Sequence, residues 1–244
     1  MKKVDIEKHG YVQMSSNDFM HKASGTPFKY IKGGAYTMGF SQAEENQAYA
    51  LSENPRLTFS EMRPVHSVTV PDTLVSVVPL TNNVASLFVD IRYENEYGNF
   101  PAFVTYEKAD QLVKFFDAEI PSEDEWEYFC RAGSPDLFTF GADVPNDDEL
   151  QRWLVSDCSN VAALNKNKFG LAALFHGEWC RNFYTRDYDP STKQTNERVV
   201  RGGGACFWPW QDEEWVWCTS AIRYPESDLE EPVSCVRPVI KIVE

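Results

Sequence analysis

A short run near the C-terminus combines four tryptophans with three acidic residues between two cysteines. Trp208 and Trp210 precede the acidic triplet at 212–214, and Trp215 and Trp217 follow it. Tryptophans two positions apart lie on one face of an extended chain, and tryptophan is enriched at the energetic centres of interfaces. The run predicts a partner-binding surface made of Trp208, Trp210, Asp212, Glu213, Trp215 and Trp217, and its acidic residues favour a basic partner. Packing of both tryptophan pairs in the local core is the alternative.

Cysteine and histidine are the other reactive side chains in the sequence. The chain has six cysteines, none with the Cys-x-x-Cys spacing of a structural zinc site, and four widely spread histidines. Cys130 is expected on a helix and Cys235 on a strand, where a buried free thiol is the common outcome. The pattern favours reduced cysteines and a cytoplasmic location.

Three helices are expected before residue 135, each with one buried stripe. Thr81 caps the first, whose apolar positions 84, 87, 88 and 91 have helical spacing. Thr105 caps the second, with apolar positions 109, 112, 113 and 116. Ser122 and Glu125 form a capping box before the third.

Strands and loops make up the rest of the expected structure. Apolar runs at 68–70, 199–201 and 236–243 predict strands. The polar stretch 41–63 predicts a long loop between two strands, and loops of that length are usually functional or mobile. We expect a single domain at 30–244, with an N-terminal extension at 1–29 packed on it or leading into it.

Charge and hydropathy narrow the classes of partner. The formal net charge is −14, so a nucleic-acid backbone would be repelled. No apolar stretch approaches the length that crosses a bilayer, and the N-terminus lacks the apolar core of a signal peptide. We expect neither nucleic acid nor membrane as a partner, and favour a protein or peptide.

Several sequence blocks occur in the order found in a known family. They are GGAYTMG at 33–39, PVHSVTV at 64–70, PSEDEWEY with RAG at 121–133, NKFGL with EWC at 167–180, and RGGG, AIRY and CVRPV at 201–239. Their order resembles the formylglycine-generating enzyme family, whose module is the sulfatase-modifying-factor domain. The resemblance implies an α+β fold, a loop-rich elaboration of the C-type lectin fold with a few helices. Relatives include copper-dependent oxidases, iron-dependent sulfur-transfer enzymes and non-catalytic binding modules, so the fold does not fix the function.

The copper chemistry of the oxidases needs two thiols close together. In those relatives two cysteines a few residues apart follow a glycine-rich turn, because soft thiolates suit copper(I). Here Cys206 follows the turn at 202–204, but the next cysteine is Cys218, and Trp-rich sequence separates them. The close spacing is absent, so we expect no catalytic residue and no copper, with Cys206 and Cys218 as the candidates if the chain is an oxidase. The His-rich helical domain of the iron enzymes is missing.

Calcium, which many relatives bind, is also expected to be absent. Asn160-Val161 matches the first ligand element, but the loop before Asn167 is short, and the last ligand block is reduced to 176–180 without its asparagine. A lectin-type sugar site is unsupported, since Val233 follows the Glu-Pro pair at 231–232 where asparagine is needed.

Other side chains in these sequence blocks have structural explanations. Arginines 201, 223 and 237 match the closing motif of the family, and buried ion pairs or hydrogen bonds to carbonyls account for them as well as substrate contact does. Trp126 and Trp179 are expected in the core, and His66 is expected to be structural.

The sequence therefore predicts a non-catalytic binding or protein-interaction module on this fold, a pseudoenzyme. Two alternatives stay open. One is a copper-dependent oxidase that converts a substrate cysteine to formylglycine with atypical thiol spacing, and the other is a structural component of a larger assembly.

Overall fold

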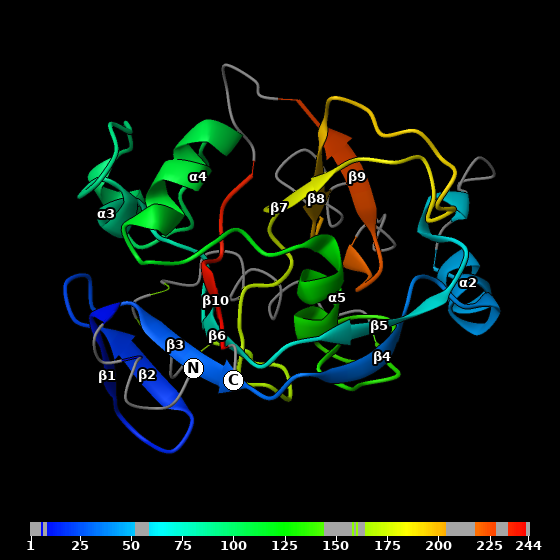
Figure 1. Ribbon diagram of the computed structural model, residues 1–244, viewed down its shortest axis with the longest axis horizontal. Helices are drawn as coiled ribbons and strands as arrows, with labels where there is room; N and C mark the ends of the chain where they lie inside the picture. The colour runs from blue at the N-terminus through cyan, green and yellow to red at the C-terminus, as the bar shows by residue number, and fades with distance from the viewer. Residues whose placement is uncertain are drawn as a thin grey trace.

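Two β-sheets and a β-hairpin surround one central helix in this computed structural model (Figure 1). The structure describes residues 6, 9–51, 59–143, 158, 160, 164–203, 218–227 and 234–242. It is an α+β fold with a few short helices, as the sequence predicts.

The larger sheet has five antiparallel strands in the order β1-β2-β3-β6-β10. Two of its strands come from the expected N-terminal extension, and β10 is shorter than the apolar run that predicts it. The strands are β1 (Tyr11–Gln13), β2 (Asp18–His21), β3 (Pro27–Ile31), β6 (Thr73–Ser76) and β10 (Val239–Lys241).

The other strands form a hairpin and a smaller sheet. β4 (Gly34–Met38) pairs with β5 (His66–Val70), and β7 (Glu178–Phe183), β8 (Arg198–Arg201) and β9 (Arg223–Glu226) form a three-stranded antiparallel sheet. The strands expected at 68–70 and 199–201 lie within β5 and β8.

Two of the expected helices begin as their caps predict. The Thr105 side chain accepts a hydrogen bond from the Lys108 amide ahead of α4 (Tyr106–Lys114). Ser122 and Glu125 form the capping box of α5 (Glu123–Arg131), which lies at the centre of the molecule against β4, β5, β7 and β8.

The first expected helix is much shorter than its apolar spacing predicts. Thr81 does cap α3, but α3 covers only Asn82–Ala85. Leu87 is 64% exposed, so the expectation of a buried stripe there was wrong. Phe88 instead stacks on Phe115 just after α4, with ring centroids 4.7 Å apart.

The polar stretch 41–63 is not a simple loop. It contains α2 (Gln42–Tyr49), which starts with a capping box at Ser41 and Glu44, and the 3-10 helix η2 (Ser60–Met62). Only Ala48 of α2 is buried, so the sequence has no apolar stripe from which this helix could be predicted. A further 3-10 helix, η3, covers Asn95–Tyr97.

The core contains the residues that the sequence assigned to packing. Trp126 on α5 and Trp179 on β7 are fully buried. The five described cysteines are all buried, namely Cys130, Cys158, Cys180, Cys218 and Cys235. Cys130 lies on α5, whereas Cys235 forms an isolated bridge with Glu178 outside the named strands.

Of the helices that the structure describes, none has the length and apolarity needed to cross a membrane.

Candidate functional site

The Trp-rich run belongs to the long connection between β8 and β9. These strands are antiparallel neighbours, and Arg201 pairs with Arg223 across the ladder. The chain therefore leaves β8 after Arg201 and returns to β9 at Arg223, so both ends of the connection start from adjacent positions. Long connections supported by paired strands commonly carry binding residues.

Glycine is required where the connection begins. Gly202 has a φ of +93°, and a Cβ atom there would lie 2.4 Å from the carbonyl oxygen of His176. Only glycine fits that combination of left-handed backbone and close approach. The Tyr224 hydroxyl on β9 donates to the carbonyl oxygen of Gly203, which ties the start of the connection to its far end.

A buried carboxylate joins the two arginines. Glu123, at the N-terminus of α5, accepts two hydrogen bonds from Arg223, at 2.8 and 3.0 Å, and one from Arg201 at 3.2 Å. Glu127, one turn further along α5, accepts from Arg201 at 2.9 Å. Both arginine side chains are fully buried, so these ion pairs fix the end of the β8–β9 pair against the helix.

Tyr188 completes the surroundings of Arg201. The Arg201 guanidinium donates to the Tyr188 hydroxyl at 2.6 Å. Burial by itself would lower the pKa of Arg201, but Tyr188, Glu127 and Glu123 outweigh it and hold the pKa well above its usual range. Arg201 therefore stays charged in the interior.

The same network extends to α2 through Arg131. Arg131 donates to Glu127 at 2.8 Å, to Glu44 on α2 at 2.6 Å and to the Gly39 carbonyl at 2.9 Å. The stretch that the sequence predicted to be a loop is thus connected to the ion pairs at the ends of β8 and β9.

Arg237 forms a second buried ion pair. It donates to both oxygens of Glu178 on β7, at 2.9 and 2.7 Å, and the Trp126 indole donates to the same carboxylate at 2.9 Å. Its remaining donors bind backbone carbonyls, including those of Ser76 and Ala172. Arginines 201, 223 and 237 are therefore structural, as the sequence favoured.

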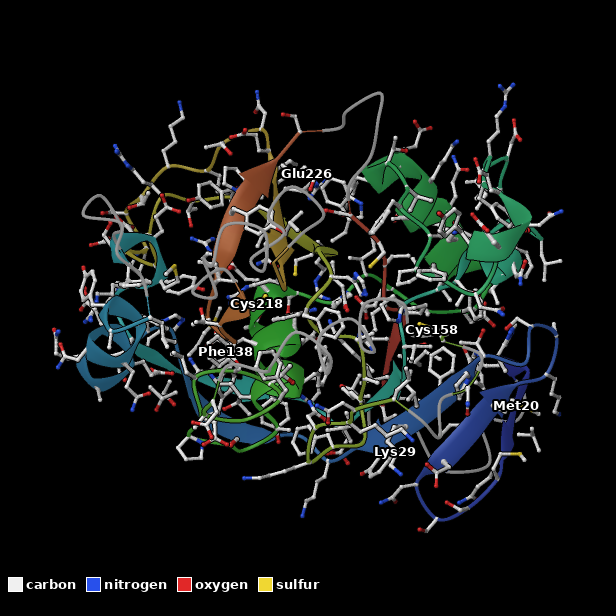
Figure 2. The ribbon with its side chains drawn as sticks, turned by 180° about the vertical axis from the view of Figure 1, so that it is seen from behind. Met20, Lys29, Phe138, Cys158, Cys218 and Glu226 are labelled. Carbon is white, nitrogen blue, oxygen red and sulfur yellow. The ribbon has the colours of Figure 1, made fainter. Side chains whose placement is uncertain are left out.

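Cys218 marks the end of the Trp-rich run in the described chain. It is 6% exposed and belongs to an apolar cluster with Phe138, Ala221 and Ile222; Figure 2 shows Cys218 beside Phe138. Burial, with a smaller contribution from Cys130, raises the pKa of the Cys218 thiol to about 12. Cys218 therefore carries a proton at neutral pH.

The other predicted site residues lie outside the described residues. They are Cys206 and the proposed partner-binding residues Trp208, Trp210, Asp212, Glu213, Trp215 and Trp217. The structure places the two ends of their segment.

Asn167, in a block that the family resemblance connects with calcium, organises the chain itself. Its side-chain oxygen accepts from the amides of Phe169 and Leu171, and its nitrogen donates to the Phe129 carbonyl at the end of α5 at 2.7 Å. Within the described ranges, no three His, Cys, Asp or Glu side chains are grouped to hold a metal ion.

His66 has structural contacts, in line with its expected role. Its Nδ1 lies 2.9 Å from the Pro64 carbonyl, and its ring packs edge-on against Tyr188 at 5.0 Å.

The sequence patterns did not identify the carboxylates that neutralise the motif arginines. The signal was there, since α5 carries acidic residues at 123, 125 and 127 on a helix that also bears core aromatic residues. Acidic side chains on a buried helix require cationic partners. Arg201 and Arg223 supply them for Glu123 and Glu127, and Arg181 supplies one for Glu125.

Comparison with sequence families agrees with this architecture. Residues 16–224 match the sulfatase-modifying factor enzyme 1-like domain. The chain belongs to this family, as the order of its sequence blocks indicated.

Individual relatives are distant. The chain is 21% identical over 237 residues to the serine/threonine-protein kinase Pkn1 of Chlamydia trachomatis, a match that covers 79% of this chain and 35% of that protein. The chain thus spans about a third of the length of that relative.

Two solved structures share the fold. PvdO from Pseudomonas aeruginosa aligns with a TM-score of 0.67 at 17% identity, over 95% of this chain and 100% of that one. Variable protein 1 of Treponema denticola aligns with a TM-score of 0.59 at 14% identity, over 89% of this chain and 95% of that one.

Proposed function

We propose that this chain is a non-catalytic protein-interaction module whose partner contacts the Trp-rich connection between β8 and β9. The observation that supports it most directly is the pairing of Arg201 with Arg223 over the shared carboxylate of Glu123. This arrangement supplies a rigid base for a long, aromatic and acidic segment, and rigid scaffolds below variable loops are a general design for recognition.

The composition of the segment defines the partner. Tryptophan gives a large contact area with few rotatable bonds, and such residues dominate interface energetics. Asp212 and Glu213, in a protein of net charge −14, attract cationic groups. The partner is therefore a protein or peptide with a basic, partly apolar surface.

The state of Cys218 supports a binding role over catalysis. Its thiol packs among apolar side chains that include Phe138, and burial keeps it protonated at neutral pH. A cysteine in such surroundings behaves as a small apolar residue. The pair spacing that the oxidases use is also absent from the sequence.

The test uses an immobilised peptide library that contains matched lysine- and arginine-rich and aspartate- and glutamate-rich sets. The proposal expects selection of basic peptides. Trp208→Ala and Trp215→Ala should each weaken the selected peptide by about 2 kcal/mol, as at an interface hot spot, while the melting temperature stays near that of the wild type. Loss of folding stability by about 3–5 kcal/mol in these variants would instead mean that the tryptophans are core residues.

A copper-dependent oxidase is the second candidate, and family membership is the observation in its favour. Such an enzyme would bind copper(I) one-to-one through Cys206 and Cys218 and oxidise a cysteine-containing peptide. Stoichiometric copper binding that disappears in both Cys206→Ser and Cys218→Ser would replace the module proposal.

A role as a structural component is the third candidate. The match to Pkn1 covers only 35% of that protein, which fits a domain that works as part of something larger. Formation of a stable homo-oligomer at micromolar concentration, unaffected by Trp208→Ala, would favour assembly over recognition of a peptide.

A further inference from the structure

A hollow lies between the N-terminal strands and the start of α3. It has a volume of about 480 Å³ and is formed by the turn between β2 and β3, the segment that leads from β6 into α3, and Asn99 with Cys158. Figure 2 shows Cys158 well separated from Cys218, which marks the end of the Trp-rich connection. The volume of the hollow falls within the range of about 300–1,000 Å³ typical of small-molecule sites.

Backbone hydrogen bonds hold the walls of this hollow in place. The Val77 amide donates to the Pro27 carbonyl and the Leu80 amide to the Val236 carbonyl, each at 2.9 Å. On the opposite side, the Cys158 amide donates to the Asn99 carbonyl at 3.1 Å. The site is therefore preformed, which reduces the entropy lost when a ligand binds.

The floor of the hollow is apolar. Val78, Leu80 and Cys158 are each less than 10% exposed and line it together with Val84. Such a floor favours a ligand with an apolar face.

Polar groups are placed around this floor. The Asn83 amide donates to the Asn99 side-chain oxygen at 2.9 Å, which orients Asn99 and leaves both hydrogens of its amide nitrogen for another acceptor. The Thr81 hydroxyl accepts from the Val84 amide and keeps its own hydrogen. Ser24 and Thr26 add two more hydroxyls, 2.8 Å apart.

The described lining of the hollow contains no charged side chain. All twelve lining residues belong to the described part of the chain, and they include no Asp, Glu, Lys, Arg or His. An ionised ligand would lose its hydration without gaining a counter-charge, and the net charge of −14 would further disfavour an anion.

From this lining we infer a binding site for a small uncharged molecule that carries hydroxyl or amide groups and one apolar face, of about the size of an acetamido sugar or a nucleoside. Asn99 and Thr81 donate to its oxygens, and Val78, Leu80 and Val84 contact its apolar face.

The test compares neutral probes with their phosphorylated counterparts. The neutral probes are N-acetylglucosamine and uridine, and the charged ones are N-acetylglucosamine 6-phosphate and uridine monophosphate. Titration into ¹⁵N-labelled protein is expected to shift the backbone amides of Gly25 and Cys158 and the side-chain amide of Asn99 with at least one neutral probe. Its phosphorylated counterpart should bind at least about tenfold more weakly, because burial of an unpaired charge is costly.

Variants locate the binding. Asn99→Ala should weaken the neutral probe by about two- to tenfold, the usual effect of one lost hydrogen bond. Val84→Phe, which adds bulk to the apolar floor, should abolish binding, and Asn196→Ala, at an exposed position elsewhere, should leave it unchanged. Melting curves confirm that each variant is folded.

Three results would each overturn the inference, and the last two are measured on binding. One is the absence of shifts at these amides with both neutral probes at tens of millimolar. The second is equal binding of neutral and phosphorylated forms, and the third is binding that Val84→Phe leaves intact in a folded protein.

Discussion

Arg201 on β8 lies directly opposite Arg223 on β9, so two like charges face each other at the end of a buried strand pair. Like charges directly opposite in a sheet are destabilising. The arrangement persists because both guanidinium groups bind Glu123, and Arg201 also binds Glu127. The carboxylates at the start of α5 therefore offset the repulsion between these two arginines on the paired strands β8 and β9.

Glu123→Gln should be strongly destabilising, since it leaves two buried cations with one carboxylate between them. Breaking a buried ion pair by removing one partner costs about 3–5 kcal/mol. Urea unfolding of the variant and the wild type measures the difference.

Glu119→Gln is the matched control for this prediction. Glu119 also pairs with a basic residue, Arg181, but its side chain is 44% exposed. Exposed pairs contribute about 0–1 kcal/mol. A loss of similar size in both variants would mean that burial of the Glu123 network is not what makes it important.

Local sequence signals predicted where two helices begin. Ion-pair partners that are far apart in the sequence could not be predicted in this way. Thr105 and the Ser122–Glu125 pair start their helices because capping depends on residues three positions apart. Glu123 and Arg223, in contrast, are 100 positions apart in the sequence, and no periodicity connects them. The family motif marked the arginines without indicating which carboxylates they bind.

The two helix errors have different physical causes. α2 was missed because its buried side consists of Ala48 alone, so the helix depends on its capping box and on the Glu44–Arg131 pair. α3 was overextended because Phe88 satisfies its apolar preference by stacking on Phe115 after the helix has ended. At α3 a tertiary contact overrides the helical periodicity, whereas α2 has no apolar periodicity from which it could be predicted.

Asn167→Ala should destabilise the protein by about 2–3 kcal/mol. The side chain satisfies the amides of Phe169 and Leu171 and a carbonyl at the end of α5, and each buried group left unpaired costs about 1–3 kcal/mol. Asn165→Ala, two positions earlier and exposed, is the control and should change stability by less than about 0.5 kcal/mol. Equal stability of the two variants in thermal melts would show that Asn167 does not organise this turn.

A chelator should leave the thermal stability unchanged. Asn167 and Glu178, which lie in the blocks that the resemblance connects with calcium, use their oxygens for backbone amides, for Arg237 and for Trp126. Melting curves with and without EDTA at constant ionic strength provide the measurement. A melting temperature that falls by many degrees in EDTA and returns with added calcium would mean that other oxygens of the chain bind the ion.

Mild acid should destabilise the protein through His176. Burial, and then the positive charge of Arg237, lower the pKa of His176 from 6.5 to about 4. The unfolded chain therefore takes up a proton as the pH falls below about 6.5, while the folded protein does so only near pH 4, so stability is lost as the pH falls through this window. Between pH 7 and pH 5, where most carboxylates remain ionised, this linkage amounts to about 2 kcal/mol.

Urea unfolding at several pH values should show this dependence of stability on pH in the wild type and a weaker dependence in His176→Gln. Part of the dependence should remain, because burial also lowers the pKa of His21. A His176→Gln profile parallel to that of the wild type would show that His176 is readily protonated in the folded protein.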